Sequence, residues 1–211
     1  MRLCRRCQQR TSRIYFTHRK PDDGRYGLVD VVCPWVVLKR RPWVRLILPC
    51  LEYEGSYRDY ITELGNEERY PFPLDFDHAD FPAMLAKLEQ FRMGVDLPQG
   101  FVPSTTYWLV DQQEMIGVAN LRHYLNARIE RAGGHIGLGV RPRERGKGLG
   151  ATLLRLTLEQ AWARSIQPVH VHCYKHNQAS ARMILANGGV LDSEIEDGGE
   201  TIQRYIISPS R

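Results

Sequence analysis

Apolar and polar residues follow two different rhythms from residue 44 onward. In short runs bounded by turn residues, most positions are apolar or β-branched, which predicts strands. In longer runs the apolar residues recur every third or fourth position, which predicts helices with one buried face. The predicted strands are 44–48, 105–110, 115–123, 135–140, 169–174, 190–195 and 201–207, and the predicted helices are 56–66, 79–93, 149–164 and 179–186.

The order of these segments predicts the class of fold. Two helices follow the first strand, and one helix follows each of the fourth and fifth strands. This interleaving predicts an α/β fold in which helices cover a mixed sheet. We expect Ser56 to cap the first helix, Asp80 to begin the second and Gly94 to end it.

Residues 1–43 differ from the rest of the chain in patterning and in charge. Their valine-rich runs are interrupted by Pro34 and Pro42, so we treat 1–43 as an extension of uncertain order and 44–208 as the folded domain. Residues 1–45 carry 12 Lys and Arg against three Asp, a balance of +9, whereas the other 166 residues carry 17 Lys and Arg against 21 Asp and Glu, a balance of −4. A basic surface for nucleic acid would have to lie in the extension alone, and we expect no nucleic-acid partner for the domain.

The composition of the 211 residues is that of a globular protein, with 43% hydrophobic and 25% charged residues. A chain of this length builds one packed core with an appendage. No apolar run approaches the roughly 20 residues that span a bilayer, and the arginine-rich N-terminus contains no apolar segment of a secretory signal. We therefore expect a cytoplasmic protein without a membrane span.

The cysteines are scattered and odd in number, so we expect reduced thiols rather than a disulfide framework. Cys4 and Cys7 have the spacing of half a zinc site, and Cys33 with His18 could in principle complete four ligands. The second ligand pair of a zinc motif is missing, and we expect no bound metal. The five cysteines are Cys4, Cys7, Cys33, Cys50 and Cys173.

A glycine-rich segment lies between the strand at 135–140 and the helix at 149–164. It reads Arg145-Gly146-Lys147-Gly148-Leu149-Gly150. Glycines let backbone N–H groups converge on an anion, and the start of a helix adds about half a positive charge. The segment is thus either a pyrophosphate-binding loop or a plain strand-to-helix turn. It lacks the Lys-Ser/Thr of a Walker loop, and it lies too late in the chain for a dinucleotide fingerprint.

This segment resembles motif A of the GNAT superfamily of acyl-CoA N-acyltransferases, Arg/Gln-x-x-Gly-x-Gly/Ala, which follows a strand ending Val-x-Pro as 140–142 does. Asn177-Gln178-Ala179-Ser180 and Asn187-Gly188-Gly189-Val190 form a second match, where the family has an Asn that opens a helix ending in Gly. The resemblance covers 44–208 and is greatest to ribosomal-protein-type and predicted bacterial acetyltransferases. It implies a GNAT-like mixed, mostly antiparallel central sheet flanked by helices, in which the strands at 135–140 and 169–174 splay apart.

The resemblance also implies where acetyl-CoA would bind as co-substrate, without a metal. Its pyrophosphate would lie on the N–H groups of 145–150, and its pantetheine arm would run along the open edge of 138–140. The N–H of Val140 would polarise the thioester carbonyl. The expected binding residues are Leu138, Gly139, Val140, Arg145, Gly146, Lys147, Gly148, Leu149, Gly150, Asn177 and Ser180.

The acceptor amine must lose a proton, and an amine with a pKa near 10 is only about one part in a thousand neutral at pH 7. Many members of the family have Glu five residues before the Val of Val-x-Pro, and His135 stands there in this chain. His135 is therefore the first candidate for the base and His123 the second, with ordinary packing as the alternative for either. The family's tyrosine acid, seven residues after Asn177, is replaced by Ile184. Tyr174 could substitute as the acid, against a purely structural role.

Two functions remain open from the sequence. The first is an N-acetyltransferase that transfers the acetyl group of acetyl-CoA to a primary amine of a small molecule, peptide or protein by direct attack in a ternary complex. Acidic residues around the two early helices would favour a cationic amine. The second is a non-catalytic acyl-CoA-binding regulatory module whose basic extension contacts nucleic acid or another partner. The sequence does not identify the acceptor or the acyl chain length, and it does not show whether the chain forms a homodimer.

Overall fold

The computed structural model of the chain describes residues 15–19, 26–30, 44–112 and 114–209. The chain divides into two compact units, Met1–Lys39 and Arg40–Arg211. In the first unit, β1 (Tyr15–Arg19) pairs antiparallel with β2 (Tyr26–Asp30). This hairpin was not predicted from the sequence, which pointed only to short valine-rich runs in this part of the chain.

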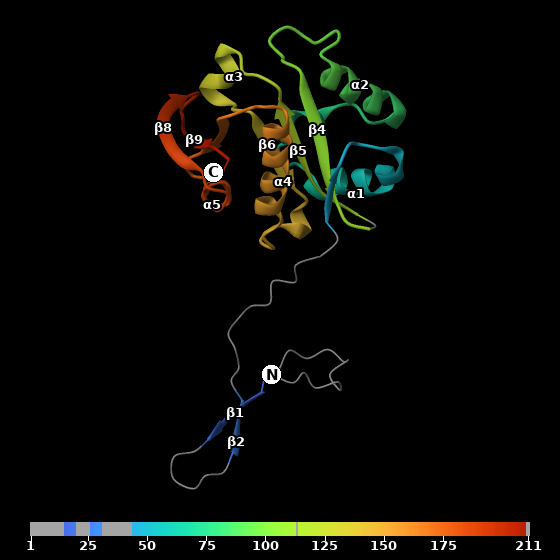
Figure 1. Cartoon of the computed structure of the whole chain (residues 1–211). Helices are drawn as coiled ribbons and strands as arrows, with labels where there is room; N and C mark the ends of the chain where they lie inside the picture. Colours follow the sequence, from blue (N-terminus) through green and yellow to red (C-terminus); the bar gives the residue numbers. More distant parts are fainter. Residues whose placement is uncertain (1–14, 20–25, 31–43, 113, 210–211) are drawn as a thin grey trace. The chain divides into compact units, whose positions relative to one another are not determined.

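The second unit contains two antiparallel sheets (Figure 1). The first has the order β3-β4-β5-β6 and the second the order β7-β9-β8. An isolated bridge joins Gly134 to Val171 between the two sheets, and the N–H of His135 donates to the carbonyl of His170 at 2.7 Å. All seven strands predicted from residue 44 onward are confirmed: β3 (Arg45–Ile47), β4 (Ser104–Val110), β5 (Met115–Arg122), β6 (Ile136–Val140), β7 (Val169–Tyr174), β8 (Val190–Asp197) and β9 (Glu200–Ile207).

Helices cover these sheets, and the four predicted ones are all present. The α-helices are α1 (Glu54–Leu64), α2 (Phe81–Met93), α3 (Ala127–Ala132), α4 (Leu149–Ala163) and α5 (Gln178–Leu185), with short 3-10 turns η1 (Leu51–Tyr53), η2 (Phe72–Asp75) and η3 (Pro142–Glu144). Helix α3 was missed because six residues are too few to show a helical period. Its capping residue is Asn126, whose side chain accepts the N–H of Ile129 at 3.0 Å.

The predicted helix ends are confirmed for α2 but wrong for α1. Asp80 accepts the N–H of Ala83 at 3.0 Å, and Gly94 ends α2 in the left-handed region at φ 72°. Helix α1 begins at Glu54, directly after η1, so Ser56 lies inside the helix and does not cap it. The Ser56 hydroxyl instead accepts the N–H of Met115 at 2.8 Å, which ties α1 to the start of β5.

The core lies on both faces of the first sheet. Trp108 packs with the aromatic residues of α1 and α2, whereas its neighbours Tyr107 and Leu109 pack with the side of the sheet that α4 covers. Alternate residues of a strand point to opposite faces, so β4 is buried from both sides. Figure 1 shows the same arrangement, with α4 in front of the sheet and α1 and α2 beside β4. The fold is the predicted helix-covered sheet.

Two further expectations concern the membrane and the cysteines. Among the described residues, no helix is both long and apolar enough to cross a membrane. Cys50 and Cys173 are free thiols, while Cys4, Cys7 and Cys33 lie outside the described residues. Within the described ranges no group of three or more His, Cys, Asp and Glu side chains could hold a metal ion.

Candidate functional site

A cavity of about 920 Å3 lies between β6, the loop before α4 and the helix α5. It brings together ten of the eleven residues expected to bind acetyl-CoA. The exception is Lys147, whose ammonium group pairs with Glu144 at 3.2 Å. The ten are Leu138, Gly139, Val140, Arg145, Gly146, Gly148, Leu149, Gly150, Asn177 and Ser180.

The loop before α4 has the backbone of an anion-binding site. Gly146 and Gly148 adopt φ values of +73° and +76°, in the left-handed region that favours glycine, and a Cβ on either would meet no atom within 4 Å. The space above them is therefore open. The N–H groups of the first residues of α4, from Leu149 onward, have no partner within the helix and carry its positive dipole end.

Arg145 differs from its expected role in this loop. Its backbone N–H donates to Pro142 at 3.2 Å, so that N–H is not free for a phosphate. Its guanidinium donates to the carbonyl of Val140 at 2.9 Å and to the carboxylate of Glu67 at 2.7 Å. Arg145 therefore fastens the loop to β6 and to the end of α1.

The free edge of β6 faces the same cavity. The N–H of Arg141 donates to Ile116 at 2.9 Å, and the carbonyl of His135 accepts from Arg122 at 2.8 Å, so the odd-numbered residues of β6 pair with β5. Backbone groups alternate in direction along an antiparallel strand. The N–H groups of Leu138 and Val140 consequently point away from β5, toward the side on which β7 diverges.

Two glycines of β6 allow another segment to lie against the strand. A Cβ on Gly139 would collide with the backbone carbonyl of Tyr70, and a Cβ on Gly137 would lie 2.7 Å from the Tyr70 hydroxyl. Only glycine fits at 139, where the clash is with backbone, whereas a side chain at 137 would displace the Tyr70 ring. Withdrawal of the Tyr70 hydroxyl from water raises its pKa, which the nearby Arg122 partly opposes. The segment around Tyr70 is thereby held over β6, a contact that the sequence analysis missed.

A smaller cavity of about 240 Å3 adjoins the first. Five residues line both cavities: Glu68, Tyr70, Leu138, Asn177 and Ser180. Tyr174, the candidate acid, lines only the smaller one, where it is 45% exposed and stacks on His176 with ring centroids 5.4 Å apart. The two cavities form the opening between β6 and β7, whose beginnings are joined and whose ends diverge.

His135, the first candidate for the base, does not line either cavity. Its Nδ1 atom accepts the backbone N–H of His170 at 3.0 Å, and burial lowers its pKa to about 4, assisted by the neighbouring His170 and Arg122. A neutral imidazole has a single lone pair in the ring plane, and here that lone pair is already used. In this arrangement His135 has no free lone pair for a proton and is joined to His170.

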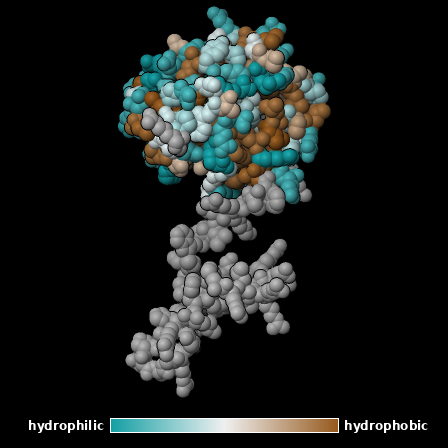
Figure 2. Space-filling model, in the orientation of Figure 1, coloured by the Kyte–Doolittle hydropathy of each residue, from teal (hydrophilic) through white to brown (hydrophobic). Residues whose placement is uncertain are grey.

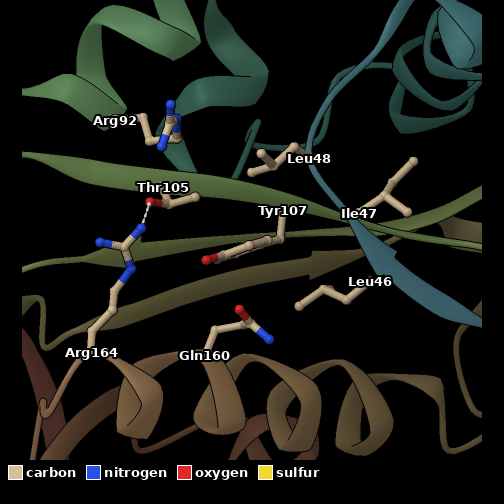
Figure 3. Close-up of a pocket in the computed structure, with 8 residues that line it drawn as sticks. All are labelled: Leu46, Ile47, Leu48, Arg92, Thr105, Tyr107, Gln160 and Arg164. Carbon is tan, nitrogen blue, oxygen red and sulfur yellow. Dashed lines mark hydrogen bonds between the residues drawn. The ribbon is translucent and has the colours of Figure 1, made fainter.

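His123, the second candidate, lines none of the three cavities but contacts a residue of the third. Its Nε2 atom is 2.8 Å from the hydroxyl of Thr105, and Thr105 lines a cavity of about 280 Å3 with Arg92, Tyr107 and Arg164. Figure 3 shows Arg164, at the end of α4, reaching Thr105 on β4, with Leu46, Ile47 and Leu48 of the β3 segment at the opposite end of the cavity. This cavity shares no lining residue with the two described above. His123 is not brought to the proposed cofactor site.

The surface around β3 is apolar. Figure 2 shows hydrophobic residues gathered on the side of the domain where β3 and α1 lie, and Leu48 and Leu51 are 48% and 58% exposed. No such gathering of apolar side chains was predicted from the sequence.

The burial of His172 and the ion pairing of the carboxylates were not predicted from the sequence. Burial lowers the pKa of His172 to about 4, with Arg204 and His170 adding to the effect, and both ring nitrogens are buried without a hydrogen-bond partner in the described part of the chain. Glu67, which lines the large cavity, pairs with Arg145 at 2.7 Å. Glu68 pairs with no lysine, arginine or histidine of the described residues.

Ile184, where the family has its tyrosine acid, is fully buried in the core against α4 and β7. The neighbouring Met183 lines the large cavity instead. This position of α5 therefore supplies no proton donor to the site.

Comparison with known proteins places this arrangement in a family. The chain matches the model of the acetyltransferase (GNAT) family over residues 61–188. That span contains β6, the glycine loop, α4 and α5. No curated protein sequence matches the chain.

Solved structures of low sequence identity share the fold. The ribosomal-protein-S5-alanine acetyltransferase of Vibrio fischeri is 16% identical, with a TM-score of 0.55 over 77% of this chain and 90% of that one. A ribosomal L7/L12 alpha-N-protein acetyltransferase in complex with coenzyme A is 16% identical, with a TM-score of 0.57 over 78% and 94%. A spermidine N-acetyltransferase chimera from Vibrio cholerae and a second enzyme is 16% identical, with a TM-score of 0.51 over 78% and 95%.

Proposed function

The chain belongs to the GNAT family of acetyltransferases, and from this membership we propose that it transfers the acetyl group of acetyl-CoA to a primary amine. One observation carries the proposal. The large cavity combines an anion-binding helix start with a strand edge whose N–H groups are free, which are the two features that a pyrophosphate and an amide-containing arm require.

The backbone supports a specific position for the cofactor. The pyrophosphate would accept hydrogen bonds from N–H groups between Gly146 and Ala151, where the positive end of α4 adds to the attraction. The pantetheine arm would run along the free edge of β6, where the N–H groups of Leu138 and Val140 point outward. Asn177 would flank the arm from α5, whose start it caps by accepting the N–H of Ser180 at 3.0 Å.

The N–H of Val140 would then polarise the thioester. A donor that is fixed in a strand loses no freedom as negative charge develops on the carbonyl oxygen, so its contribution grows in the transition state. The carbonyl of the same residue accepts from Arg145 at 2.9 Å, which holds the peptide in place. Val140 is thus the proposed oxyanion donor.

The smaller cavity supports a route for the acceptor. An amine that enters past Tyr174 and Glu68 would meet the acetyl group where the two cavities join, so both substrates would be bound at once. The amine nitrogen would attack the carbonyl carbon, the C–N bond would form, and the C–S bond would break to release CoA. Direct attack in a ternary complex therefore needs no acetylated enzyme residue.

Two measurements on the full chain test this function. Calorimetry with acetyl-CoA tests binding, and release of free CoA thiol tests transfer to spermidine, butylamine and a peptide with a free α-amino group. We expect binding, and thiol release that depends on at least one of these amines. A chain that does not bind acetyl-CoA would contradict the placement of the cofactor.

The second function, a regulatory module that binds acyl-CoA without catalysis, has one observation in its favour. Ile184 is buried in the core, so the site lacks the family's usual proton donor. Binding of acetyl-CoA without thiol release by any amine of the panel would support this alternative over the enzyme.

A further inference from the structure

We propose that Glu68 accepts the proton of the attacking amine, an inference that rests on the proposed acetyltransferase function. The reacting atoms must lie where a cofactor in the large cavity and an acceptor in the small one can meet. The side chains that border this meeting point are those that line both cavities. They are Glu68, Tyr70, Leu138, Asn177 and Ser180.

Glu68 is the member of this set with the right chemistry. Leu138 has no ionisable group, the Ser180 hydroxyl is a much weaker base than a carboxylate, and the Asn177 side chain is used to cap α5. Tyr70 keeps its proton at neutral pH, because the withdrawal of its hydroxyl from water raises its pKa. A carboxylate is ionised at neutral pH and can accept a proton without losing a hydrogen-bond partner.

The neighbouring carboxylates are neutralised, and Glu68 is not. Glu67 pairs with Arg145 at 2.7 Å, and Glu63 pairs with Arg143 at 2.8 Å and with Arg141. In the part of the chain that the structure describes, no cationic side chain pairs with Glu68. Its charge is therefore available to a cationic or hydrogen-bonding amine at the point where the cavities join.

The histidines do not compete for this role. The lone pair of His135 already accepts the N–H of His170. His172 lines the small cavity, but both of its ring nitrogens are buried. Glu68, in contrast, is exposed and lines both cavities.

Contacts of Tyr70 hold Glu68 at this point. The loop after α1 lies against Gly137 and Gly139, where any side chain on β6 would collide with Tyr70. The N–H of Tyr70 also donates to the carbonyl of Glu68 at 3.0 Å. The carboxylate is thus on a loop whose position depends on the strand that polarises the thioester.

The ammonium form of the acceptor first gives its extra proton to water. The neutral amine then attacks the carbonyl carbon, and its nitrogen becomes acidic as the C–N bond forms. Glu68 takes the N–H proton, the C–S bond breaks, and Glu68 passes this proton to the CoA thiolate, directly or through a water molecule. The products are the N-acetyl amine and CoA thiol, and Glu68 returns to its ionised form.

The test compares Glu68→Gln with Asp59→Asn in the full chain. Asp59 is an exposed carboxylate on α1 that lines neither cavity, so its loss removes the same charge without touching the site. We expect Glu68→Gln to lower kcat by about 10² to 10⁴, with a dissociation constant for acetyl-CoA within about threefold of wild type. Asp59→Asn should keep the wild-type kcat.

Chemical rescue separates proton transfer from a structural role. In Glu68→Ala, added formate should restore part of the lost rate, because a small carboxylate can occupy the space that the side chain leaves. Glu68→Asp should retain more activity than Glu68→Gln. Neither response is expected of a residue that only shapes the loop.

Different results would overturn the assignment of Glu68 and the proposed acetyltransferase function. If the wild type releases CoA with an amine of the panel and Glu68→Gln does so at a rate within about threefold, the assignment of Glu68 is overturned while the acetyltransferase stands. If the wild type binds acetyl-CoA but acetylates none of the amines, the proposed function falls, and the role of Glu68 falls with it.

Discussion

The Nδ1 atom of His135 accepts the backbone N–H of His170 at 3.0 Å, and the N–H of His135 donates to the carbonyl of His170 at 2.7 Å. These two bonds join the beginnings of β6 and β7. Beyond them the strands diverge around the two cavities. His135 therefore closes one end of the opening in which we place the cofactor.

Replacement of His135 should affect stability rather than the chemical step. His135→Ala leaves the buried N–H of His170 without an acceptor, at a cost of about 1–3 kcal/mol in the free energy of unfolding. His135→Asn offers an amide oxygen near the position of Nδ1 and should cost less. Urea denaturation measures both changes, and CoA release should stay within a few-fold of wild type. A fall in kcat of about 10² or more at unchanged stability would instead return His135 to the role of base.

The two buried histidines also make stability depend on pH. Burial lowers the pKa values of His135 and His172 to about 4, below the ordinary value of 6.5. Between these values the unfolded chain binds more protons than the folded chain, so the free energy of unfolding falls as the pH falls from 6.5 toward 4 and is fully retained above 6.5. The charged and titratable neighbours His170, Arg122 and Arg204 disfavour protonation further.

Urea denaturation at several pH values across this window checks the dependence. His135→Asn should show a smaller loss of stability on acidification than wild type, because one of the two histidines no longer titrates. An identical slope for the two proteins would show that folding does not change the pKa of His135.

Local patterns were sufficient to predict the elements of the domain and the cofactor loop. The strands and the longer helices have periods that extend over several residues, and the glycine loop is a contiguous segment. Ten of the eleven residues predicted to bind acetyl-CoA therefore lie together in one cavity. The six-residue helix α3 has no room for such a period, and it was missed.

Contacts between distant segments could not be predicted in the same way. Three contacts join residues that are far apart in sequence. They are the hydrogen bond from the His170 N–H to His135, the approach of the Tyr70 carbonyl to Gly139 and the ion pair of Glu67 with Arg145. The alternating glycines of β6 were a visible signal of close approach, but not of what approaches. The choice of base changed for this reason, since it depends on which lone pairs are already used.

Arg141 is a further residue whose importance only the structure reveals. Its guanidinium is buried at the end of β6, where it donates to Glu63 at 2.9 Å and to the hydroxyl of Ser56 at 3.2 Å. Arg141→Ala should lower the free energy of unfolding by about 3 kcal/mol or more, because the carboxylate and hydroxyl lose their buried partner. Arg143→Ala is the matched control. Its half-exposed guanidinium also pairs with Glu63, at 2.8 Å, and its loss should cost under about 1 kcal/mol. Equal costs for the two variants would argue against a role of burial at Arg141.

Two substitutions of Gly148 that differ only in charge test the anion-binding loop. Asn and Asp are the side chains that best tolerate its left-handed φ of +76°, and a side chain there would extend into open space above the loop. Gly148→Asp and Gly148→Asn should therefore fold with similar stability. Only the aspartate opposes a pyrophosphate at the start of α4, so Gly148→Asp should bind acetyl-CoA about tenfold or more weakly than Gly148→Asn in calorimetry. Equal affinities of the two variants for acetyl-CoA would show that the pyrophosphate does not bind at this loop.

Removal of residues 1–43 tests the domain boundary that we propose. The strands β3 to β9, the three cavities and the residues assigned to acetyl-CoA all lie between residues 44 and 209. The shortened chain keeps every one of these elements and loses all eleven Lys and Arg residues of the extension. We therefore expect it to unfold cooperatively in urea and to bind acetyl-CoA with the dissociation constant of the full chain. Weaker binding by the shortened chain would mean that the extension contributes to cofactor binding. A shortened chain that does not fold would place part of the 1–43 segment in the core, and the domain would then have to begin before residue 44.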